Sequence, residues 1–287
     1  MKRKILDCLI IGAGPAGISA ALYLHRFRRN ILIVDSGNSR MLKIPKSHNY
    51  PAFKEGISGP DLLNKLKEQL LFYNIPIHSD NIITLDKTKN DNFISNQYFK
   101  SKTVILATGI QDIEIKLPQI KKFDLRFCPI CDAYEVINKE IAIVGNDSHS
   151  VSEALFLRRY SESITLLTQG NTLTMKDLKI IQTAKIKVIT DAIIDLDYIG
   201  SKIRIHFSNH NKAIFDTLYS ALGCTKNSNL ALRLGAKHKE GELIVNASQQ
   251  TSIPKLYAAG DIVSGLNQIC VAQSQGAIAA SDINQLL

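Results

Sequence analysis

The segment Ile5-Leu-Asp-Cys-Leu-Ile-Ile11 runs directly into Gly12-Ala-Gly14-Pro-Ala-Gly17. A short apolar run of this kind is typical of a strand that is buried on both faces of a parallel sheet. After the glycines, apolar residues at positions 18, 21, 22 and 24 recur at helical spacing. The segment therefore predicts a buried strand, a tight turn and a helix in that order.

A carboxylate follows at the position where a dinucleotide-binding strand would carry one. The apolar run Ile31–Val34 ends in Asp35, 18 residues after Gly17. This spacing completes the fingerprint of a dinucleotide site, in which Gly12 makes the tight turn and Gly14 lets the backbone approach a diphosphate. Gly17 then allows the helix to pack closely on the strand, and the helix N-terminus faces the diphosphate. We expect Asp35 to bond the hydroxyl groups of the adenosine ribose.

Two later segments also predict a buried strand that ends in a glycine turn. They are Lys102–Gly109 and Thr251–Asp261, and the second ends in a glycine followed by a carboxylate. An aspartate there can accept hydrogen bonds from sugar-like hydroxyl groups, such as those of the ribityl chain of a flavin. The alternative for Asp261 is a residue that only stabilises a turn.

The composition describes a folded protein of one or two domains. Hydrophobic residues make up 45% of the 287 residues and charged residues 21%, which excludes disordered, collagen-like and coiled-coil classes. The charge is 35 − 26 = +9, which favours acidic partners. The basic residues are spread along the chain without zinc spacing or a helix-turn-helix pattern, so we expect no nucleic-acid binding.

An uncharged stretch near the N-terminus could be mistaken for a membrane segment. Cys8–Leu24 is 17 residues long. A spanning helix needs about 20 residues, and glycines and Pro15 interrupt this stretch. We therefore expect no membrane association and, without a recognisable leader, a cytoplasmic protein.

The reactive part of the sequence is Phe127-Cys128-Pro-Ile-Cys131-Asp132. Two cysteines separated by two residues can close a small disulfide ring, and a helix that begins there would lower the pKa of a thiol. A metal site would need a second pair of ligands, which the sequence lacks, so we expect no metal. Asp132 could pass a proton to or from a thiolate, and its alternative is a solvated helix start. We expect the remaining cysteines to be small core residues: Cys8, Cys224 and Cys270.

Together these residues resemble the low-molecular-weight thioredoxin reductase family of FAD-dependent pyridine nucleotide-disulfide oxidoreductases. The resemblance covers nearly the whole chain. The segments that carry it are Gly12–Gly17, His48–Pro51 with Gly56–Pro60, Ala107–Gly109, Cys128–Asp132, Thr251–Asp261 and Asn267–Ile269.

This resemblance implies an α/β fold of two Rossmann-like (three-layer ββα) nucleotide-binding domains, the second inserted into the first. The FAD domain would comprise 1–114 and 245–287, and the NADPH-type domain at 115–244 would carry the CxxC pair. In the family the inserted domain rotates, so that the disulfide alternately faces the flavin and the partner protein. Members are commonly homodimers, which we carry over by analogy.

The resemblance also assigns site residues. Electrons would pass between the flavin and a protein disulfide, such as that of a thioredoxin-like protein, through Cys128 and Cys131, next to which Asp132 stands. The FAD-binding positions expected from the fingerprint and the resemblance are Gly12, Gly14, Pro15, Ala16, Gly17, Asp35, Asn49, Thr108, Gly109, Gly260, Asp261, Gln268 and Ile269.

The chain departs from the family in the expected NADPH motif. Ile141–Gly145 supplies the strand and the first glycine, but Asp147 stands where the second glycine should admit a diphosphate. The next strand ends in Thr168-Gln169 instead of the arginine pair that binds the 2′-phosphate. Charge-assisted hydrogen bonds contribute about 1.5–3 kcal/mol each, so ordinary NADPH use is doubtful.

A degraded second motif is also similar to a side branch of the family, and alternatives therefore stay open. One is an oxygen-dependent FAD dithiol oxidase that acts on a small dithiol, and another is a reductase fed by an acidic ferredoxin-type electron donor. A flavin-binding redox sensor without turnover is a third hypothesis. The sequence leaves open the electron donor, the substrate, the direction of electron flow and the attacking cysteine.

Overall fold

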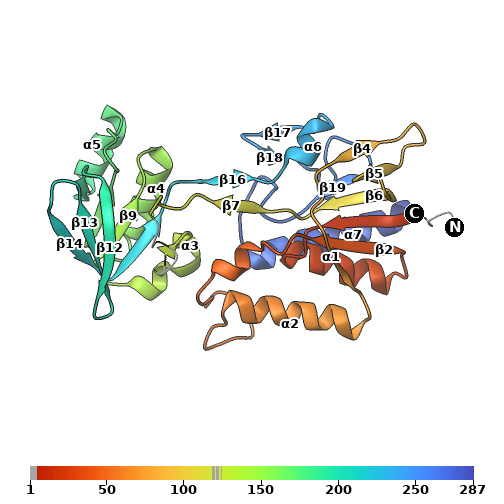
Figure 1. The fold of residues 1–287 in the computed structure, drawn as a ribbon, viewed down its shortest axis with the longest axis horizontal. Helices are drawn as coiled ribbons and strands as arrows, with labels where there is room; N and C mark the ends of the chain where they lie inside the picture. Colours follow the sequence, from red (N-terminus) through yellow and green to blue (C-terminus); the bar gives the residue numbers. More distant parts are fainter. Residues whose placement is uncertain (1–4, 118–119, 121–122, 124) are drawn as a thin grey trace. The chain divides into compact units, whose positions relative to one another are not determined.

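The computed structural model describes residues 5–117, 120, 123 and 125–287. The chain divides into two compact units, of which the first comprises Met1–Gln111 with Thr225–Leu287 and the second comprises Asp112–Cys224 (Figure 1). The chain passes from one unit to the other in β7 (Ile110–Asp112) and returns in β16 (Cys224–Lys226), and these two strands pair with each other. The second unit is thus inserted into the first.

The unit boundaries differ from those expected from the sequence. The insert ends at 224 instead of 244, and the first boundary follows residue 111 instead of 114. Residues 225–244 belong to unit 1, because α6 (Asn229–Arg233) and β18 (Glu242–Leu243) bring Leu230 and Leu243 into the hydrophobic cluster that contains Leu9. β17 (His238–Lys239) pairs with β18 in this segment.

Unit 1 is built on a sheet in the order β3-β2-β1-β6-β5-β4, with β19 paired to β6. β1, β2, β3, β6 and β19 run parallel, whereas β4 and β5 join the edge antiparallel. The strands are β1 (Leu6–Ile11), β2 (Ile31–Asp35), β3 (Ile77–Ser79), β4 (Leu85–Lys87), β5 (Phe93–Ser95), β6 (Phe99–Leu106) and β19 (Leu256–Ala258).

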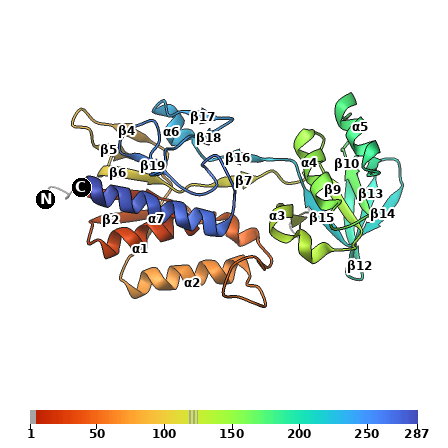
Figure 2. The same cartoon turned by 180° about the vertical axis from the view of Figure 1, so that it is seen from behind.

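The two faces of this sheet have separate cores, as strand alternation requires. Cys8 and Ile10 of β1 pack with α1 (Pro15–Arg26), α2 (Gly59–Phe72) and α7 (Ile269–Leu286), while Leu9 and Ile11 face the cluster on the other side. α1 and α7 lie against each other (Figure 2). Their approach is close because Gly276 has no side chain: a Cβ there would stand 2.2 Å from the carbonyl oxygen of Ala16.

Unit 2 contains a second parallel sheet in the order β11-β10-β9-β15-β8. Its strands are β8 (Leu125–Arg126), β9 (Ile141–Val144), β10 (Ile164–Leu167), β11 (Lys187–Ile189) and β15 (Thr217–Ser220). One face is covered by α4 (Ser148–Leu157) and α5 (Met175–Thr183), and α3 (Pro129–Asp132) with the 3-10 turn η3 (Ala133–Val136) lies beside α4.

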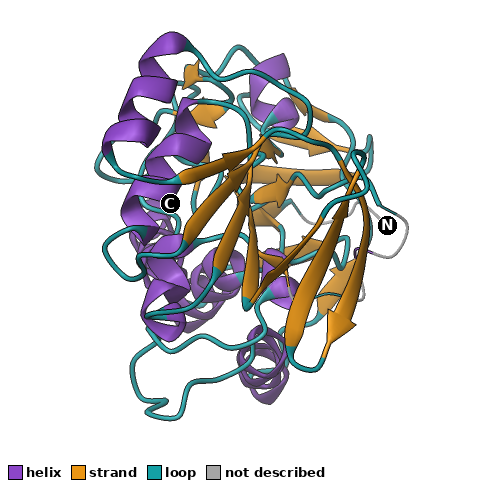
Figure 3. Ribbon diagram, turned by 90° about the vertical axis from the view of Figure 1, so that its left-hand side faces the viewer, coloured by secondary structure: helices purple, strands orange, loops and turns teal. Residues whose placement is uncertain are grey.

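An antiparallel sheet of β12 (Ile193–Ile199), β13 (Lys202–Phe207) and β14 (Lys212–Phe215) covers the other face (Figure 3). Unit 2 therefore has three layers, each unit is built on a largely parallel sheet, and the α/β fold of two Rossmann-like units is confirmed. Among the helices in the described residues, none is long and apolar enough to cross a membrane.

Candidate active site

The glycine turn between β1 and α1 has the geometry that a close backbone approach requires. Gly12 has φ +104°, and a Cβ there would lie 2.3 Å from the carbonyl oxygen of Ala107. At Gly17 a Cβ would lie 1.9 Å from the carbonyl oxygen of Gly12. At Gly14, by contrast, the nearest described atom would be Ser39 Oγ at 3.8 Å. The backbone is crowded behind the turn and open at Gly14.

The N-terminus of α1 is available to an anion. Gly14 is the N-cap residue and Pro15 follows it at the start of the helix, and no side chain of the described residues caps this end. α2 is capped by Ser58 and α5 by Thr174, whereas α7 begins without a side-chain cap from the described part of the chain, as α1 does. Unsatisfied N–H groups and the helix dipole at such an end favour a phosphate group.

Asp35 stands at the end of β2 and holds the same turn. Its Oδ1 accepts a hydrogen bond from the backbone N–H of Ala13 at 3.0 Å, and its Oδ2 accepts one from Gly37 at 3.1 Å. A carboxylate has about four lone-pair sites, so Asp35 can accept further hydrogen bonds from ribose hydroxyl groups.

The start of α7 brings a second group of expected residues together. Gln268 is the N-cap and Ile269 the first residue of α7. Asn49 Nδ2 donates to Gln268 Oε1 at 2.8 Å, and the backbone N–H of Gly260 donates to Gln275 Oε1 at 2.7 Å. Four of the expected positions, in segments far apart in the sequence, are thus gathered around α7: Asn49, Gly260, Gln268 and Ile269.

The two groups meet at the N-terminus of α1. A Cβ at Gly260 would lie 3.2 Å from Cβ of Ala16, in the first turn of the helix. Thr108 is equally close to the glycine turn, since a Cβ at Gly12 would lie 3.3 Å from its backbone nitrogen. Thr108 Oγ1 also donates to the carbonyl oxygen of Asn227 at 2.7 Å, and the backbone N–H of Asn227 donates to the carbonyl oxygen of Gly109 at 3.1 Å.

Arg40 belongs to this site although the sequence pattern did not single it out. It begins the 3-10 turn η1 (Arg40–Lys43), which Ser39 caps. Its Nη1 lies 3.1 Å from Oδ2 of Asp261, and both side chains are largely buried. A guanidinium next to an open helix N-terminus is suited to bind phosphate oxygens. The residues of unit 1 therefore fit a dinucleotide with a diphosphate bridge.

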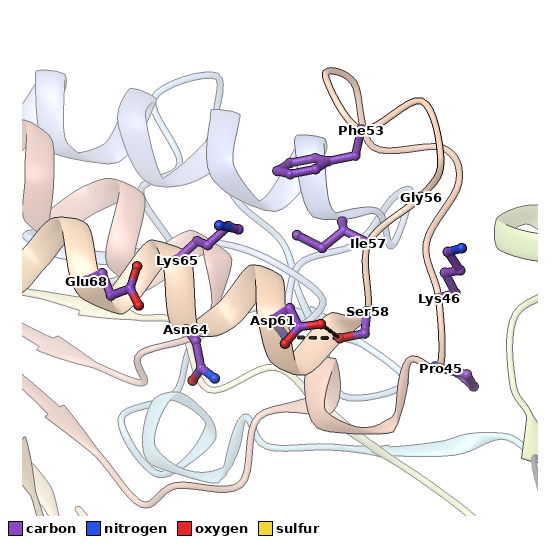
Figure 4. A pocket seen from close by; sticks show the side chains of 10 residues that line it. All are labelled: Pro45, Lys46, Phe53, Gly56, Ile57, Ser58, Asp61, Asn64, Lys65 and Glu68. Atoms are coloured by element: carbon purple, nitrogen blue, oxygen red, sulfur yellow. Dashed lines mark hydrogen bonds between the residues drawn. The ribbon is translucent and has the colours of Figure 1, made fainter.

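A separate cavity of about 620 Å³ lies beside α2 (Figure 4). Phe53 and Ile57 form an apolar wall, and Ser58 bonds Asp61 at the start of the helix. Its lining includes none of the residues that the sequence assigned to the site: Pro45, Lys46, Phe53, Gly56, Ile57, Ser58, Asp61, Asn64, Lys65 and Glu68.

In unit 2, Cys128 and Cys131 form a disulfide, with their Cα atoms 5.3 Å apart. The short helix α3 begins directly after Cys128, and the backbone N–H of Cys131 donates to the carbonyl oxygen of Cys128 at 2.9 Å. Ile130, between the two cysteines, is 58% exposed. The pair therefore sits on a compact turn of which one side chain faces solvent.

The three cysteines outside the pair differ in how deeply they are buried. Cys8 lies in the core as expected, and burial raises the pKa of its thiol to about 12. Cys224 is half-buried and Cys270 is exposed, so the expectation of three core cysteines is wrong for these two. Cys270 lies off the buried stripe of α7, which runs through Ala272, Gly276 and Ala280.

Asp132 is held by two side chains from neighbouring strands. Oδ2 accepts a hydrogen bond from Nη1 of Arg126 at 2.7 Å, and Oδ1 accepts one from the hydroxyl of Tyr219 at 2.6 Å. Its side chain is only 14% exposed, so the alternative of a solvated helix start is wrong. Burial raises the pKa of the Asp132 carboxyl above its ordinary value. Within the described residues, no cluster of His, Cys, Asp or Glu could hold a metal ion.

The comparisons with known proteins agree with this arrangement. A family model described as "Pyridine nucleotide-disulphide oxidoreductase" matches residues 6–276. The chain belongs to this family. It is therefore a flavin-dependent disulfide oxidoreductase, and the resemblance drawn from the sequence is confirmed.

Curated relatives and a solved structure cover this oxidoreductase along almost its whole length. The thioredoxin reductase of Buchnera aphidicola subsp. Schizaphis graminum is 28% identical over 308 residues, 97% of this chain and 96% of the relative. That of Mycoplasma genitalium is 29% identical over 301 residues, covering 96% and 94%. The crystal structure of thioredoxin reductase from Streptococcus pyogenes matches with a TM-score of 0.87 and 26% identity, covering 98% and 97%.

The family implies a pyridine nucleotide as well as a flavin, and the residues of unit 2 do not fit a dinucleotide diphosphate. Asp147 caps α4: its Oδ1 accepts a hydrogen bond from the backbone N–H of Ser150 at 2.9 Å. A Cβ at Gly145 would stand 2.2 Å from Cβ of Ser150, which therefore fills the space behind the turn. Ser148 Oγ donates to the buried carboxylate of Asp177 at 3.0 Å. Two carboxylates thus occupy the end of α4 where a diphosphate would bind.

Proposed function

We propose that this oxidoreductase is an FAD-dependent thiol–disulfide oxidoreductase of the thioredoxin reductase type. In this proposal the Cys128–Cys131 pair exchanges electrons with the disulfide of a thioredoxin-like protein. The observation that carries it is the disulfide between these two cysteines, followed directly by a largely buried carboxyl group, in a chain of this family. The relatives named above are thioredoxin reductases, which supports the choice of partner.

The proposed FAD site lies in unit 1. The open N-terminus of α1 and the guanidinium of Arg40 would hold the diphosphate, and Asp35 would bond the adenosine ribose. Asp261, Asn49 and Gln268 would line the flavin half of the site. When bound, the flavin would supply a redox centre between the electron donor and the Cys128–Cys131 pair.

The chain's own residues carry the exchange with the partner. In the reduced protein a thiolate of the pair attacks the partner's disulfide, the partner's S–S bond breaks, and one partner sulfur leaves as a thiolate. The second thiol of the pair then displaces the mixed disulfide, so that the Cys128–Cys131 bond forms and the partner gains two electrons. Asp132 is placed next to Cys131 in the chain, where it can accept the proton that a thiol loses.

We further propose that the electron donor is not NADPH bound at α4. The support is the capped turn at Asp147, the buried Asp177 beside it, and the absence of a basic residue at Thr168-Gln169. The net charge of +9 is suited to an acidic donor protein such as a ferredoxin or flavodoxin. A homodimer and a cytoplasmic location remain part of the proposal by analogy with the family.

An anaerobic titration of the FAD-loaded protein tests these proposals. We expect a dithiol or a reduced ferredoxin-type donor to bleach the flavin absorbance, and NADPH and NADH at micromolar levels to leave it unchanged. Full bleaching by NADPH at such levels would refute the donor proposal.

The rate at which the protein reduces a protein disulfide tests the role of the cysteine pair separately from flavin binding. Cys131→Ser should abolish the reduction of a thioredoxin disulfide while flavin binding stays normal, and unchanged turnover would refute the role of the pair. Cys270→Ser, which removes an exposed cysteine outside the pair, is the matched control. Oxygen uptake with peroxide formation on addition of a small dithiol, together with inactivity toward thioredoxin, would favour a dithiol oxidase instead.

A further inference from the structure

Arg126 and Tyr219 form a small network with Asp132 that the expected mechanism does not use. They are register partners on the adjacent parallel strands β8 and β15, so their side chains leave the sheet on the same face. Arg126 binds one oxygen of Asp132 at 2.7 Å and Tyr219 binds the other at 2.6 Å. Both oxygens of one carboxyl group are therefore fixed by the edge of the sheet.

The network joins the two ends of the segment that carries the redox pair. Arg126 comes two residues before Cys128, and Asp132 comes directly after Cys131. The ion pair between Arg126 and Asp132 closes this length of chain into a loop that contains both cysteines. A positive and a negative charge are thus held at the two ends of the CxxC turn.

Burial strengthens the contacts of Asp132 with Arg126 and Tyr219. Tyr219 is fully buried, and the side chains of Arg126 and Asp132 are 26% and 14% exposed. In such a site a hydrogen bond or ion pair is screened less than in water. Burial raises the pKa of Tyr219, with the neighbouring carboxylate of Asp132 adding to the effect, so the phenol stays protonated and acts as a donor.

Another charged group near Asp132 belongs to η3, and the helix α4 packs beside α3. Glu135 in η3 is a second carboxyl group, and its repulsion adds to the effect of burial on the pKa of Asp132. Its Oε2 is buried without a hydrogen-bond partner among the described residues. On α4, His149 and Glu153 pair with each other at 3.3 Å, and Asp147 caps its own helix.

We propose that Arg126 and Tyr219 are positioning residues that hold Asp132 at the CxxC turn and thereby set the acidity of the reduced Cys128–Cys131 thiols. The inference rests on the proposed function, because it concerns the same pair. When a reducing dithiol opens the disulfide, two electrons enter the pair and the reductant becomes a disulfide. The sulfur that leaves does so as a thiolate, and whether it then takes up a proton depends on the charges beside it.

Substitutions of Arg126 and Asp132, at the two ends of the loop, should shift the pKa of the cysteine thiols in opposite directions. Arg126→Met leaves the buried carboxylate without its cation, which opposes a neighbouring thiolate, so the thiol pKa should rise by about one to two units. Asp132→Asn leaves the guanidinium without its anion, so the thiol pKa should fall. Tyr219→Phe removes one donor and should raise the thiol pKa by less than Arg126→Met does.

The test is the pH dependence of alkylation of the reduced pair. Protein reduced with dithiothreitol and freed of it anaerobically is reacted with iodoacetamide from mildly acid to alkaline pH, and peptide mass spectrometry reads each cysteine. A rise of one pKa unit gives about a tenfold slower reaction at neutral pH. The reduction potential of the pair against dithiothreitol buffers at several pH values is the second readout, and Arg126→Lys should restore most of the wild-type profile.

Matched variants separate this effect from a loss of packing. Arg204→Met breaks another Arg–Asp pair of unit 2, in which Nη2 lies 3.0 Å from Oδ1 of Asp197. Tyr257→Phe removes a buried hydroxyl that donates to Asp282 at 2.7 Å. Neither should move the alkylation profile. If Arg126→Met fails to fold, Tyr219→Phe and Arg126→Lys still carry the comparison.

Two results would overturn the inference. The first is that the pH dependence of alkylation in Tyr219→Phe and in Arg126→Met coincides with that of the wild type. The second is that this pH dependence shifts in Glu135→Gln but in none of the other variants. A wild-type pair that dithiothreitol cannot reversibly reduce would instead refute the proposed function itself. The alkylation assay reads each cysteine directly and needs no turnover of a disulfide substrate, so the two failures are distinguishable.

Discussion

The carboxylate of Asp147 accepts a hydrogen bond of 2.9 Å from the backbone N–H of Ser150, and the Ser150 hydroxyl accepts one of 3.1 Å from the backbone N–H of Asp147. This reciprocal capping box satisfies donors that a nucleotide-binding helix would offer to a phosphate. The corresponding helix of unit 1, α1, begins at Gly14 without a side-chain cap among the described residues. The two units thus present opposite chemistry at equivalent helix ends.

The capping box makes Asp147 a stabilising residue. Asp147→Ala should lower the free energy of unfolding by about 0.5–2 kcal/mol, the usual effect of losing an N-cap. Urea unfolding monitored by circular dichroism measures this loss. The comparison is Thr174→Ala, which removes the N-cap of α5 in the same unit. Asp147→Ala should not make NADPH a donor, because Asp177 remains beside the turn; flavin reduction by NADPH in this variant would contradict that expectation.

Arg40 should bind the diphosphate of FAD. Removal of its guanidinium in Arg40→Met should weaken FAD binding about 10- to 100-fold, since a charged hydrogen bond contributes about 1.5–3 kcal/mol. Quenching of flavin fluorescence on titration of the apoprotein measures the dissociation constant without any turnover. Riboflavin, which lacks phosphate groups, should bind wild type and variant equally.

The matched control for Arg40 is Arg26→Met. Arg26 lies at the end of α1 and contacts only the hydroxyl of Tyr73 among the interactions of the described residues, at 3.4 Å. The Arg26→Met variant should bind FAD with the affinity of the wild type. Equal FAD affinity in Arg40→Met and Arg26→Met would show that Arg40 does not bind the diphosphate.

The parts of the site that the sequence predicts well are those made by local chemistry. A buried strand, a turn that only glycine can make and a helix follow one another between Leu6 and Arg26, and β1 and α1 occupy that span. Gly12 and Gly17 are required by contacts within the turn and its neighbouring strand. Likewise, the spacing of Cys128 and Cys131 is itself what permits their disulfide.

The parts of the site and of the fold that could not be predicted from the sequence depend on contacts between distant segments. Arg40 meets Asp261 across 221 positions, and Tyr219 meets Asp132 across 87 positions. No periodicity or local motif marks either contact. The end of the insert was placed too late for a similar reason, since the assignment of α6 to unit 1 rests on packing of Leu230 against the first sheet.

The three cysteines outside the pair should differ in reactivity. At neutral pH, iodoacetamide should label Cys270 readily and leave Cys8 unlabelled, because Cys8 is fully buried and its thiol has a pKa of about 12. Cys224, which is half-buried, should react at an intermediate rate. Peptide mass spectrometry of the folded protein measures the rates, and labelling in urea is the control in which all three should react alike.

Tyr257 should make the protein sensitive to alkaline pH. Burial and the hydrogen bond to Asp282 raise the pKa of its phenol above the value of about 10 in an unfolded chain. Because the folded-state pKa is raised, its contribution to stability is complete below that unfolded value and declines as the pH rises beyond it. The decline amounts to about 1.4 kcal/mol per pH unit for one such group.

Tyr257→Phe cannot ionise, so its free energy of unfolding should fall less steeply above the unfolded pKa than that of the wild type. Urea unfolding of the apoprotein at a series of alkaline pH values gives the slopes, which are independent of the stability that the variant loses at neutral pH. Tyr134→Phe is the control, because Tyr134 is 76% exposed. A Tyr257→Phe slope equal to that of Tyr134→Phe would mean that the phenol of Tyr257 ionises in the folded protein as readily as in the unfolded chain.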